Sequence, residues 1–224
     1  MKVIRAKGEV TFDIELEKNL LARNKSLARV NRKRFDQFKI LVIDIMGSIG
    51  SGKTSLIKAI LRKLSMGEAV GVIAGDLTTT IDAKRIKQEG ARVVQINTGK
   101  ECHLDAHLVG QAIEKMLLDR IKILFIENVG NLICPGEFPL GAHKRLVVTS
   151  VTEGPYMVVK HPYIFREADV IVLNKIDLAK AMKVSPSQLE RDARKINPQA
   201  HFIQTNALKG IGIGKIINAL GLKT

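Results

Sequence analysis

The sequence predicts an α/β domain in which helices cover both faces of a mostly parallel sheet. Apolar runs without polar alternation recur along the chain, as expected of strands that are buried on both faces. Helix-like segments separate these runs, which is the pattern of parallel strands joined by crossovers. The polar motifs of the chain also follow the predicted strands directly, and ligands of such sheets bind outside the carboxyl ends of the strands.

Apolar runs place the expected strands at residues 40–46, 69–74, 92–96, 121–126, 145–151, 169–173 and 201–205. Helical spacing of apolar residues places the expected helices at 55–64, 101–120, 186–195 and 214–219, with a short charged helix at 82–89. The segment 101–120 carries the clearest pattern, because six apolar side chains between Leu104 and Leu117 recur every three or four positions. We expect two parts, a basic N-terminal helical extension at 1–38 and a nucleotide-binding domain at 39–224.

The extension is amphipathic, since apolar residues from Leu16 to Val30 recur near helical spacing and four cations follow from Arg29 to Arg34. It either packs on the nucleotide domain, which we favour, or contacts a partner or a second copy. The net charge of +14 fits an acidic protein partner, a solvated lysine-rich surface or nucleic acid. Nucleic acid ranks last, because aromatic residues for base stacking make up 4% of the chain.

The composition fits a chain with a sizeable core and no membrane contact. It has 224 residues, 46% of them hydrophobic, and no run reaches the roughly 18 apolar residues of a membrane span. We expect a cytoplasmic protein without a signal peptide, because the N-terminal segment is charged throughout. Its two cysteines, Cys102 and Cys134, are then expected to be reduced.

The first strand leads into a complete G-x-x-x-x-G-K-[ST] motif at residues 47–54. Its glycines let backbone N–H groups curl around an anion, Lys53 reaches the terminal phosphates, and Thr54 offers its hydroxyl to Mg²⁺. The alternative is a glycine-rich turn with a surface lysine, but the strand before and the helix after are the context that the motif requires. The expected nucleotide contacts here are Gly47, Ser48, Gly50, Ser51, Gly52, Lys53, Thr54 and Ser55.

The base is predicted to be guanine, so the cofactor is GTP or GDP. The stretch N-K-x-D at 174–177 follows a strand, and the carboxylate of Asp177 can accept from the ring N–H and the exocyclic amine of guanine. Lys175 can lie over the base, and Asn174 can tie this loop to the phosphate loop. The stretch Asn206-Ala207-Leu208 resembles the loop that supports the base.

Carboxylates after two strands predict GTP hydrolysis. Glu127 can hold Mg²⁺ through water, and the N–H of Gly130 can sense the γ-phosphate. Asp76 is either a second magnesium-side carboxylate or a helix cap before Ile81. Together with Lys53 and Thr54, these residues suffice for phosphoryl transfer. No arginine or water-positioning residue stands out, so we expect slow intrinsic turnover that a partner or a second protomer accelerates.

A second site for a different metal is predicted from the cysteines. In the expected helix at 101–120, His103 and His107 lie one turn apart with Cys102 at the start. Cys134 follows the Glu127 segment, and both stretches emerge at one edge if the third and fourth strands are neighbours. Thiolate and imidazole ligands suit Zn²⁺ or Ni²⁺. The alternative is that the cysteines are small buried hydrophobic residues.

The pattern resembles the HypB family of GTPases, which assist nickel insertion into nickel-iron hydrogenases. The likeness runs from residue 40 to the C-terminus and rests on G-S-I-G-S-G-K-T, G-D-L-T-T-T-I-D-A-x-R-I, E-C-H-L-D-A-H, I-E-N-V-G-N-L-I-C-P, S-V-T-E-G and N-K-I-D. It implies a P-loop NTPase-type fold of the SIMIBI class, in which Cys102, His103 and Cys134 bind nickel or zinc near a GTP-dependent homodimer interface. The implied partners are a nickel-delivery protein and the hydrogenase large-subunit precursor complex.

Two metal-binding motifs of related proteins are missing from this sequence, which limits what the resemblance implies. Many bacterial members carry an N-terminal Cys-x-x-Cys-Gly-Cys nickel motif and a histidine-rich stretch, which the N-terminal segment lacks. The Cys-Pro-His metal motif of the related urease GTPase is missing as well. We therefore expect only the weaker metal site of the G domain. The competing functions are a regulatory GTPase chaperone for a urease-type or cobalamin-type enzyme, with structural cysteines, and a nucleotide-gated RNA-binding module.

Overall fold

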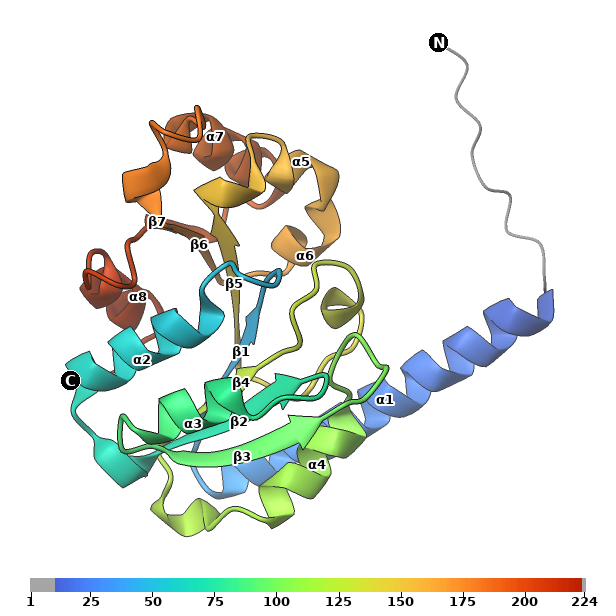
Figure 1. Cartoon of the computed structure of the whole chain (residues 1–224). Helices are drawn as coiled ribbons and strands as arrows, with labels where there is room; N and C mark the ends of the chain where they lie inside the picture. Colours follow the sequence, from blue (N-terminus) through green and yellow to red (C-terminus); the bar gives the residue numbers. More distant parts are fainter. Residues whose placement is uncertain (1–10, 223–224) are drawn as a thin grey trace.

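The structure of the protein is a computed structural model that describes residues 11–222. Its centre is a sheet with the strand order β3-β2-β4-β1-β5-β6-β7, in which all neighbouring strands run parallel (Figure 1). The strands are β1 (Leu41–Met46), β2 (Val70–Asp76), β3 (Arg92–Asn97), β4 (Ile123–Glu127), β5 (Lys144–Ser150), β6 (Val170–Asn174) and β7 (His201–Gln204). The expected fold class is confirmed, and each expected strand is present to within a few residues.

Helices cover both faces of this sheet. One face carries α2 (Lys53–Leu64), α3 (Ile81–Lys87) and α8 (Ile213–Ala219). The other carries α1 (Thr11–Gln37), α4 (Ala106–Glu114), α5 (Met157–Lys160), α6 (Pro162–Arg166) and α7 (Pro186–Ile196). Short 3₁₀ helices lie at η1 (Gly67–Ala69), η2 (Leu118–Arg120), η3 (Cys134–Gly136), η4 (Val151–Glu153) and η5 (Ile176–Leu178). Successive residues of β1 alternate between the faces, so that Ile43 and Ile45 enter one cluster while Val42 enters another.

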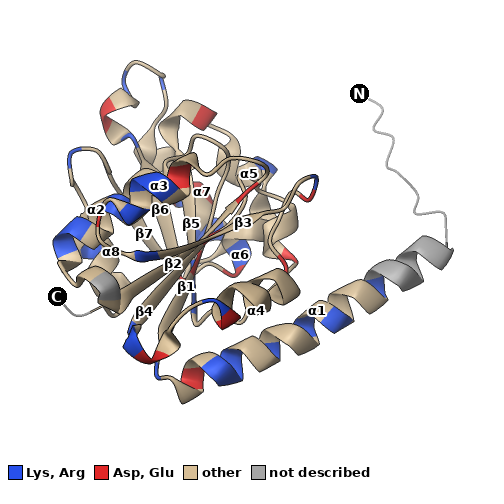
Figure 2. Ribbon diagram, turned by 60° about the horizontal axis from the view of Figure 1, so that its bottom comes forward, with Lys and Arg blue, Asp and Glu red and all other residues tan. Residues whose placement is uncertain are grey.

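The N-terminal helix α1 packs on the domain through its C-terminal half, which was the favoured expectation. The side-chain amide of Asn31 donates to the carbonyl oxygens of Ala106 (2.8 Å) and Leu140 (3.2 Å), and Phe35 is fully buried. The earlier turns extend past the edge of the domain (Figure 1). Lys and Arg residues recur along the part of the helix that is not drawn in grey (Figure 2). Its C-terminal half is therefore part of the fold rather than a detachable tail.

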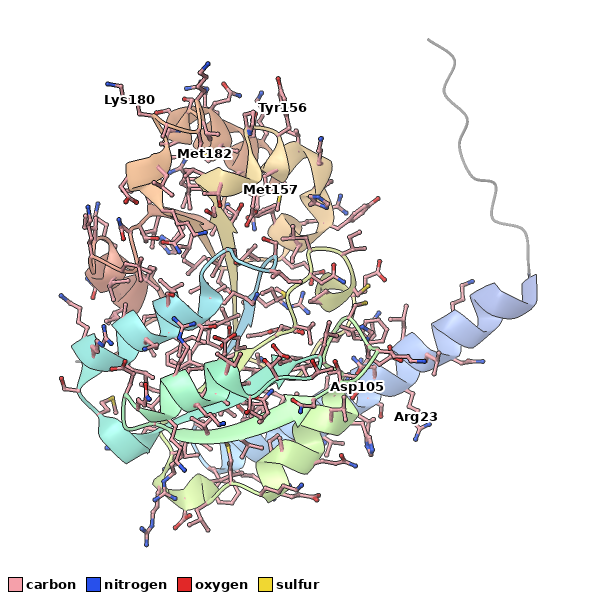
Figure 3. All side chains as sticks on the ribbon, viewed as in Figure 1. Arg23, Asp105, Tyr156, Met157, Lys180 and Met182 are labelled. Atoms are coloured by element: carbon pink, nitrogen blue, oxygen red, sulfur yellow. The ribbon has the colours of Figure 1, made fainter. Side chains whose placement is uncertain are left out.

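The helix expected at 101–120 is wrong at both ends, because α4 spans only Ala106–Glu114. Asp105 caps it, with a side-chain oxygen that accepts from the N–H of Leu108 at 2.7 Å (Figure 3). Leu104 precedes the cap and shares a core cluster with Val109, as in a hydrophobic staple. The staple continues the apolar spacing into a segment that is not helical, which explains the error.

The strand order does not meet the condition that the sequence analysis set for bringing the cysteines together. The third and fourth strands are not neighbours, because β2 lies between β3 and β4. The segments that follow β3 and β4 nevertheless meet beyond the carboxyl ends of these strands, since the chain after β3 crosses the end of β2. Within the described residues, no helix is long and apolar enough to cross a bilayer.

Candidate nucleotide and metal site

The phosphate loop joins β1 to α2 and depends on two glycines for its shape. Gly47 has a φ of 148°, and a Cβ there would lie 2.2 Å from the carbonyl oxygen of Val148. Gly52 has a φ of 103°, and a Cβ there would lie 2.3 Å from the side-chain nitrogen of Asn174. Both positions therefore require glycine. The loop lies where the sequence places a phosphate site, at the start of α2.

A cleft of about 340 Å³ opens over this loop and brings the expected catalytic residues together. Its lining includes Lys53, Thr54, Asp76, Glu127 and Gly130. Lys53 is buried, and its ammonium donates to the carbonyl oxygens of Gly47 and Ser48, each at 3.0 Å. Burial lowers the pKa of Lys53, and the charge of Glu127 opposes this shift.

Thr54 and Glu127 form the part of the cleft that suits a magnesium ion. The hydroxyl of Thr54 donates to Oε1 of Glu127 at 2.6 Å. The other carboxylate oxygen, Oε2, is buried and lacks a hydrogen-bond partner among the described residues. Burial raises the pKa of Glu127 to about 7, against the opposing effects of the Thr54 hydrogen bond and the Lys53 charge. A carboxylate with an unsatisfied oxygen beside a hydroxyl is the donor set that Mg²⁺ takes.

Asp76 ends β2 at the rim of the same cleft. Its Oδ1 accepts from the N–H groups of Thr78 (3.0 Å) and Thr79 (2.7 Å). Burial acts to raise the pKa of Asp76, but these N–H groups hold it below its ordinary value. The alternative role as a helix cap is wrong, because Thr80 occupies the N-cap position of α3. Asp76 instead shapes the turn before α3 and lines the cleft as a carboxylate.

The residues expected to bind the base form a small hollow of about 130 Å³ next to the phosphate loop. It is lined by Gly52, Ser55, Asn174, Lys175, Asp177, Leu178, Asn206, Ala207 and Leu208. Asn174 organises it, because its amide nitrogen donates to the carbonyl of Ser51 (3.0 Å) and its oxygen accepts from the N–H of Ala207 (3.1 Å). Lys175 donates to the carbonyl of Gly50 at 2.7 Å. The contact from Asn174 to the phosphate loop is thus the one expected from the sequence.

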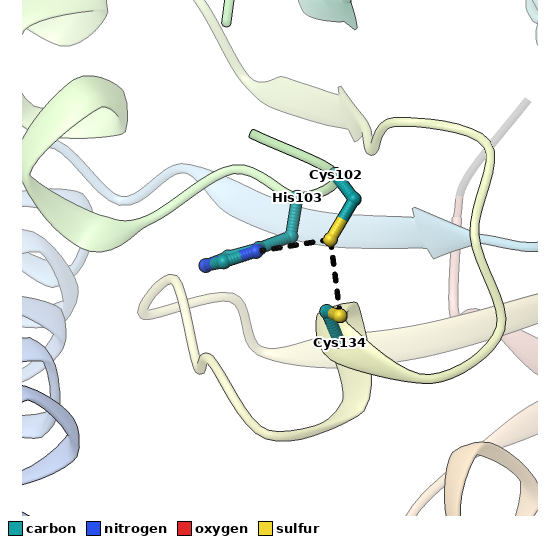
Figure 4. Close-up of side chains that lie close together, drawn as sticks. All are labelled: Cys102, His103 and Cys134. Atoms are coloured by element: carbon teal, nitrogen blue, oxygen red, sulfur yellow. Dashed lines mark hydrogen bonds between the residues drawn. The ribbon is translucent and has the colours of Figure 1, made fainter. Parts of the chain in front are cut away.

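Cys102, His103 and Cys134 converge on one point beyond the sheet (Figure 4). The sulfur atoms of Cys102 and Cys134 are 3.0 Å apart, and Nδ1 of His103 lies 3.9 Å from the Cys102 sulfur. One ligand atom from each of the three lies within 4.8 Å of the others, so a single ion can contact all of them. Both cysteines are free thiols. This donor set suits Zn²⁺ or Ni²⁺.

The surroundings favour the metal-binding form of the imidazole. Burial lowers the pKa of His103, so that less proton competition opposes a metal, although the charge of Glu101 acts the other way. The His103 ring lies against Phe138, with the ring centroids 3.9 Å apart. The hydrogen bond to Cys102 and burial raise the pKa of the Cys134 thiol. Metal binding must therefore displace a proton from this thiol.

The helical arrangement expected for these ligands is wrong. Cys102 and His103 precede α4, so they occupy a loop rather than the first turn of a helix. His107 lies in α4, but it is not part of the metal-binding group; its Nε2 lies 3.1 Å from the side-chain nitrogen of Gln111. His107 and His103 both line a separate hollow, to which residues of α1 also contribute.

Two asparagines connect the metal site to the nucleotide cleft. Oδ1 of Asn128, which follows Glu127, accepts from the N–H of Leu104 at 3.0 Å. The amide of Asn131 donates to the carbonyl of Cys102 at 3.4 Å, and Asn131 also forms a β-bridge with Gly47 of the phosphate loop. The thiol-bearing loops are therefore tied directly to segments that line the cleft. The E-N-V-G-N stretch contains both asparagines, but sequence reasoning assigned neither a role.

Other residues in or beside the cleft were also missed. Glu153, in η4 just after β5, accepts from Thr149 at 2.9 Å and from the hydroxyl of Ser48, so it braces the phosphate loop. Burial raises the pKa of this carboxyl. Arg85 and Asp82 reach the cleft from α3 and pair with each other at 3.0 Å. Both belong to the G-D-L-T-T-T-I-D-A-x-R-I stretch, but their reach into the cleft depends on how α3 crosses the sheet.

Comparisons with known proteins agree with this geometry. Residues 41–204 match the CobW/HypB/UreG nucleotide-binding domain. The probable hydrogenase maturation factor HypB of Methanocaldococcus jannaschii is 48% identical over 204 residues, which cover 91% of this chain and 92% of that protein. The crystal structure of HypB from Archaeoglobus fulgidus gives a TM-score of 0.83 at 42% identity, over 89% of this chain and 98% of that one.

A crystal structure of HypB from Helicobacter pylori in complex with nickel gives a TM-score of 0.84 at 32% identity, over 88% of this chain and 93% of that one. The strand order and these structural matches confirm the P-loop NTPase-type fold of the SIMIBI class. Matches of this extent in both sequence and fold confirm the resemblance first noted in the motifs. The chain belongs to the CobW/HypB/UreG family, and within it to the HypB hydrogenase maturation factors.

Proposed function

We propose that this protein is a GTP-hydrolysing metallochaperone that assists nickel insertion during the maturation of nickel-iron hydrogenases. The observation that carries the proposal is the meeting of Cys102, His103 and Cys134 within 4.8 Å, on loops attached to the nucleotide cleft. A nickel-bound relative supports the choice of metal. In this view nickel is the cargo, and the nucleotide state sets how tightly it is held.

GTP is the proposed nucleotide, because Asp177 offers a double acceptor at the edge of the hollow beside Asn174. Lys53 would bind the terminal phosphates, while Thr54 and Glu127 would hold Mg²⁺, which supplies charge neutralisation. Asp76 and Gly130 complete the cleft at the side where the γ-phosphate would lie. We expect slow turnover by the isolated protomer; a monomer that hydrolyses tens of GTP molecules per second would contradict this.

A GTP-dependent homodimer would complete both sites. Three ligands leave a metal shell open, and a second chain can supply the remainder. Apolar side chains are exposed around the sites at Ile49 (79%), Ile133 (62%) and Ile81 (62%). We expect light scattering to report a dimer with a GTP analogue and a monomer with GDP. Ile133→Asp should prevent the dimer, and dimerisation that is unaffected by this change would rule out the surface.

The basic face of α1 is the proposed docking site for an acidic nickel-delivery partner and, with it, the hydrogenase large-subunit precursor complex. Lys25, Arg29 and Lys33 are exposed at successive turns. Deletion of residues 1–35 is a poor test, because it removes the buried Phe35. Charge reversal of these three cations should abolish binding of the partner and leave the fold intact. Undiminished binding by the reversed variant would rule out this docking site.

Equilibrium dialysis of Ni²⁺ and Zn²⁺ tests the central proposal. Wild type and Cys102→Ala are compared, each with GDP and with a non-hydrolysable GTP analogue. We expect wild type to bind metal with an affinity that depends on the nucleotide, and the variant to lose binding. Equal binding by both proteins would make the cysteines structural and leave a regulatory GTPase chaperone. A thiolate site also requires reduced cysteines, which supports a cytoplasmic location.

A further inference from the structure

Leu104 anchors the loop that carries Cys102 and His103. Its side chain is fully buried and lies against the end of β2, where a Cβ on Gly75 would come within 2.8 Å of its Cδ1. Its backbone N–H donates to Oδ1 of Asn128 at 3.0 Å. The two ligand residues directly precede this anchor, so any displacement of Leu104 moves them.

Asn128 is placed to control that anchor. The residue is completely buried, and Oδ1 accepts from the N–H of Val129 (3.0 Å) as well as from Leu104. Its side-chain nitrogen donates to Asp44 at 3.3 Å, and its backbone N–H donates to Ile45 at 2.9 Å, which continues the ladder between β4 and β1. Asn128 also follows Glu127 directly and lines the nucleotide cleft. One side chain therefore spans the distance between the cleft and the metal loop.

The second thiol is attached to the cleft by a different route. Cys134 follows Gly130 and Asn131, and a Cβ on Gly130 would lie 2.4 Å from Cγ1 of Ile49 in the phosphate loop. Asn131 is bridged to Gly47, at the start of the same loop. A shift of the segment after β4 therefore carries Cys134 with it. The same shift reaches the backbone of the loop that carries Cys102 through the asparagine contacts, and Asn128 makes the shorter and more buried of these.

We propose that Asn128 is a positioning residue that couples the nucleotide cleft to the metal site by holding the backbone of Leu104. Nucleotide exchange that moves the end of β4 then changes the spacing of the two sulfur atoms. The inference rests on the proposed function, because it requires that nucleotide and metal bind at these two sites. By reciprocity, the metal changes nucleotide affinity by the same factor.

The test measures the dissociation constant of Ni²⁺ by equilibrium dialysis, with GDP and with a GTP analogue, and takes the ratio of the two. We expect a ratio of about fivefold or more, in either direction, for wild type. In Asn128→Ala the ratio should fall to about one, because the Leu104 N–H loses its acceptor while all three metal ligands remain. The reciprocal ratio of nucleotide affinities, with and without Ni²⁺, should fall equally.

Asn24 provides a matched control. It is a buried asparagine whose oxygen accepts from the N–H of Ala106 at 2.8 Å and whose nitrogen donates to Pro139 at 2.9 Å. Asn24→Ala thus removes a comparable anchor near the metal loop, but on the side of α1 rather than of the nucleotide. The ratio should stay at its wild-type value in this variant. A merely structural role for Asn128 would make the two variants alike.

Thermal unfolding checks that both variants fold. If Asn128→Ala does not fold, Asn131→Ala replaces it, since Asn131 is only half-buried and holds the Cys102 carbonyl in the same loop; its ratio should fall at least halfway to one. An unchanged ratio in the folded variant, or an equal loss in Asn24→Ala, overturns the inference. A wild-type ratio of one overturns it as well. Nickel binding that is absent from wild type, or undiminished in Cys102→Ala, instead overturns the proposed function.

Discussion

Asp44 should make the protein less stable as the pH rises from acid to neutral. This carboxyl is buried in the middle of β1, with one oxygen bonded to Asn128 and the other without a partner among the described residues. Burial raises its pKa from 3.8 to about 6, although the charge of Arg145 and the Asn128 hydrogen bond oppose the shift. Asp44→Asn replaces it with a side chain of the same shape that never ionises.

The sign and size of the effect follow from proton linkage. Between pH 3.8 and about 6 the unfolded chain has released this proton while the folded chain retains it, so the free energy of unfolding falls as the pH rises. Above about pH 6 both states are ionised and the full penalty, about 3 kcal/mol, is present. Integration gives a penalty of about 1 kcal/mol at pH 4.5. Asp44→Asn should therefore gain about 2 kcal/mol relative to wild type between pH 4.5 and 7.5.

Urea denaturation of both proteins at several pH values measures this gain. The exposed Asp119 supplies the control, because Asp119→Asn also removes one negative charge from a basic protein but none from its interior. A free-energy difference between Asp44→Asn and wild type that stays flat over this range would refute the assignment of a buried, partly unsatisfied carboxyl. A difference that shrinks as the pH rises would mean that folding lowers the pKa of Asp44 instead of raising it.

Three further changes test the site. Gly130→Ala places a Cβ 2.4 Å from Ile49, so it should lower the free energy of unfolding in urea by about 1–3 kcal/mol and weaken binding of fluorescent GDP. In the control, Gly136→Ala, the new Cβ meets nothing closer than 3.7 Å and should be tolerated. Asp177→Asn should weaken GTP binding by about a hundredfold or more, measured by calorimetry, and unchanged affinity would refute the guanine assignment. Phe138→Ala removes the ring against His103 and should weaken Ni²⁺ binding by about tenfold without removing a ligand; equal affinity in dialysis would contradict this.

The sheet and the nucleotide cleft could be predicted from the sequence because their signals are local. The strands are mostly apolar runs, with Asp44 as an exception inside β1, and the phosphate loop follows its strand at a fixed position. Asn174 could also be assigned its contact with the phosphate loop, because two parallel strands that end at one edge bring their loops together. The order of the strands in the sheet could not be predicted in the same way. The position of β2 between β3 and β4 depends on which crossovers pack best, and no short stretch of sequence records it.

The proposed metal ligands illustrate the difference between residue identity and geometry. Cys102, His103 and Cys134 are predictable as candidate ligands, because thiolates and imidazoles suit Zn²⁺ and Ni²⁺. Their arrangement is not, because Leu104 belongs to the apolar periodicity of α4 while lying outside the helix. The cap at Asp105 was the signal that could have ended the helix there. Asn128 could not have been found in this way, since its partner Leu104 is distant in the sequence.

The loop position of these ligands also bears on how the site can work. Two histidines one turn apart on a helix would be held at a spacing set by the helix itself, which a movement of neighbouring strands hardly changes. Cys102 and Cys134 instead sit on separate loops, each fastened to a different segment of the nucleotide cleft through Asn128 and through the Gly130–Asn131 stretch. The 3.0 Å between their sulfur atoms is therefore a property of how those segments are placed. If the proposed function holds, a site built this way would respond to the nucleotide, whereas a helical pair would bind metal regardless of it.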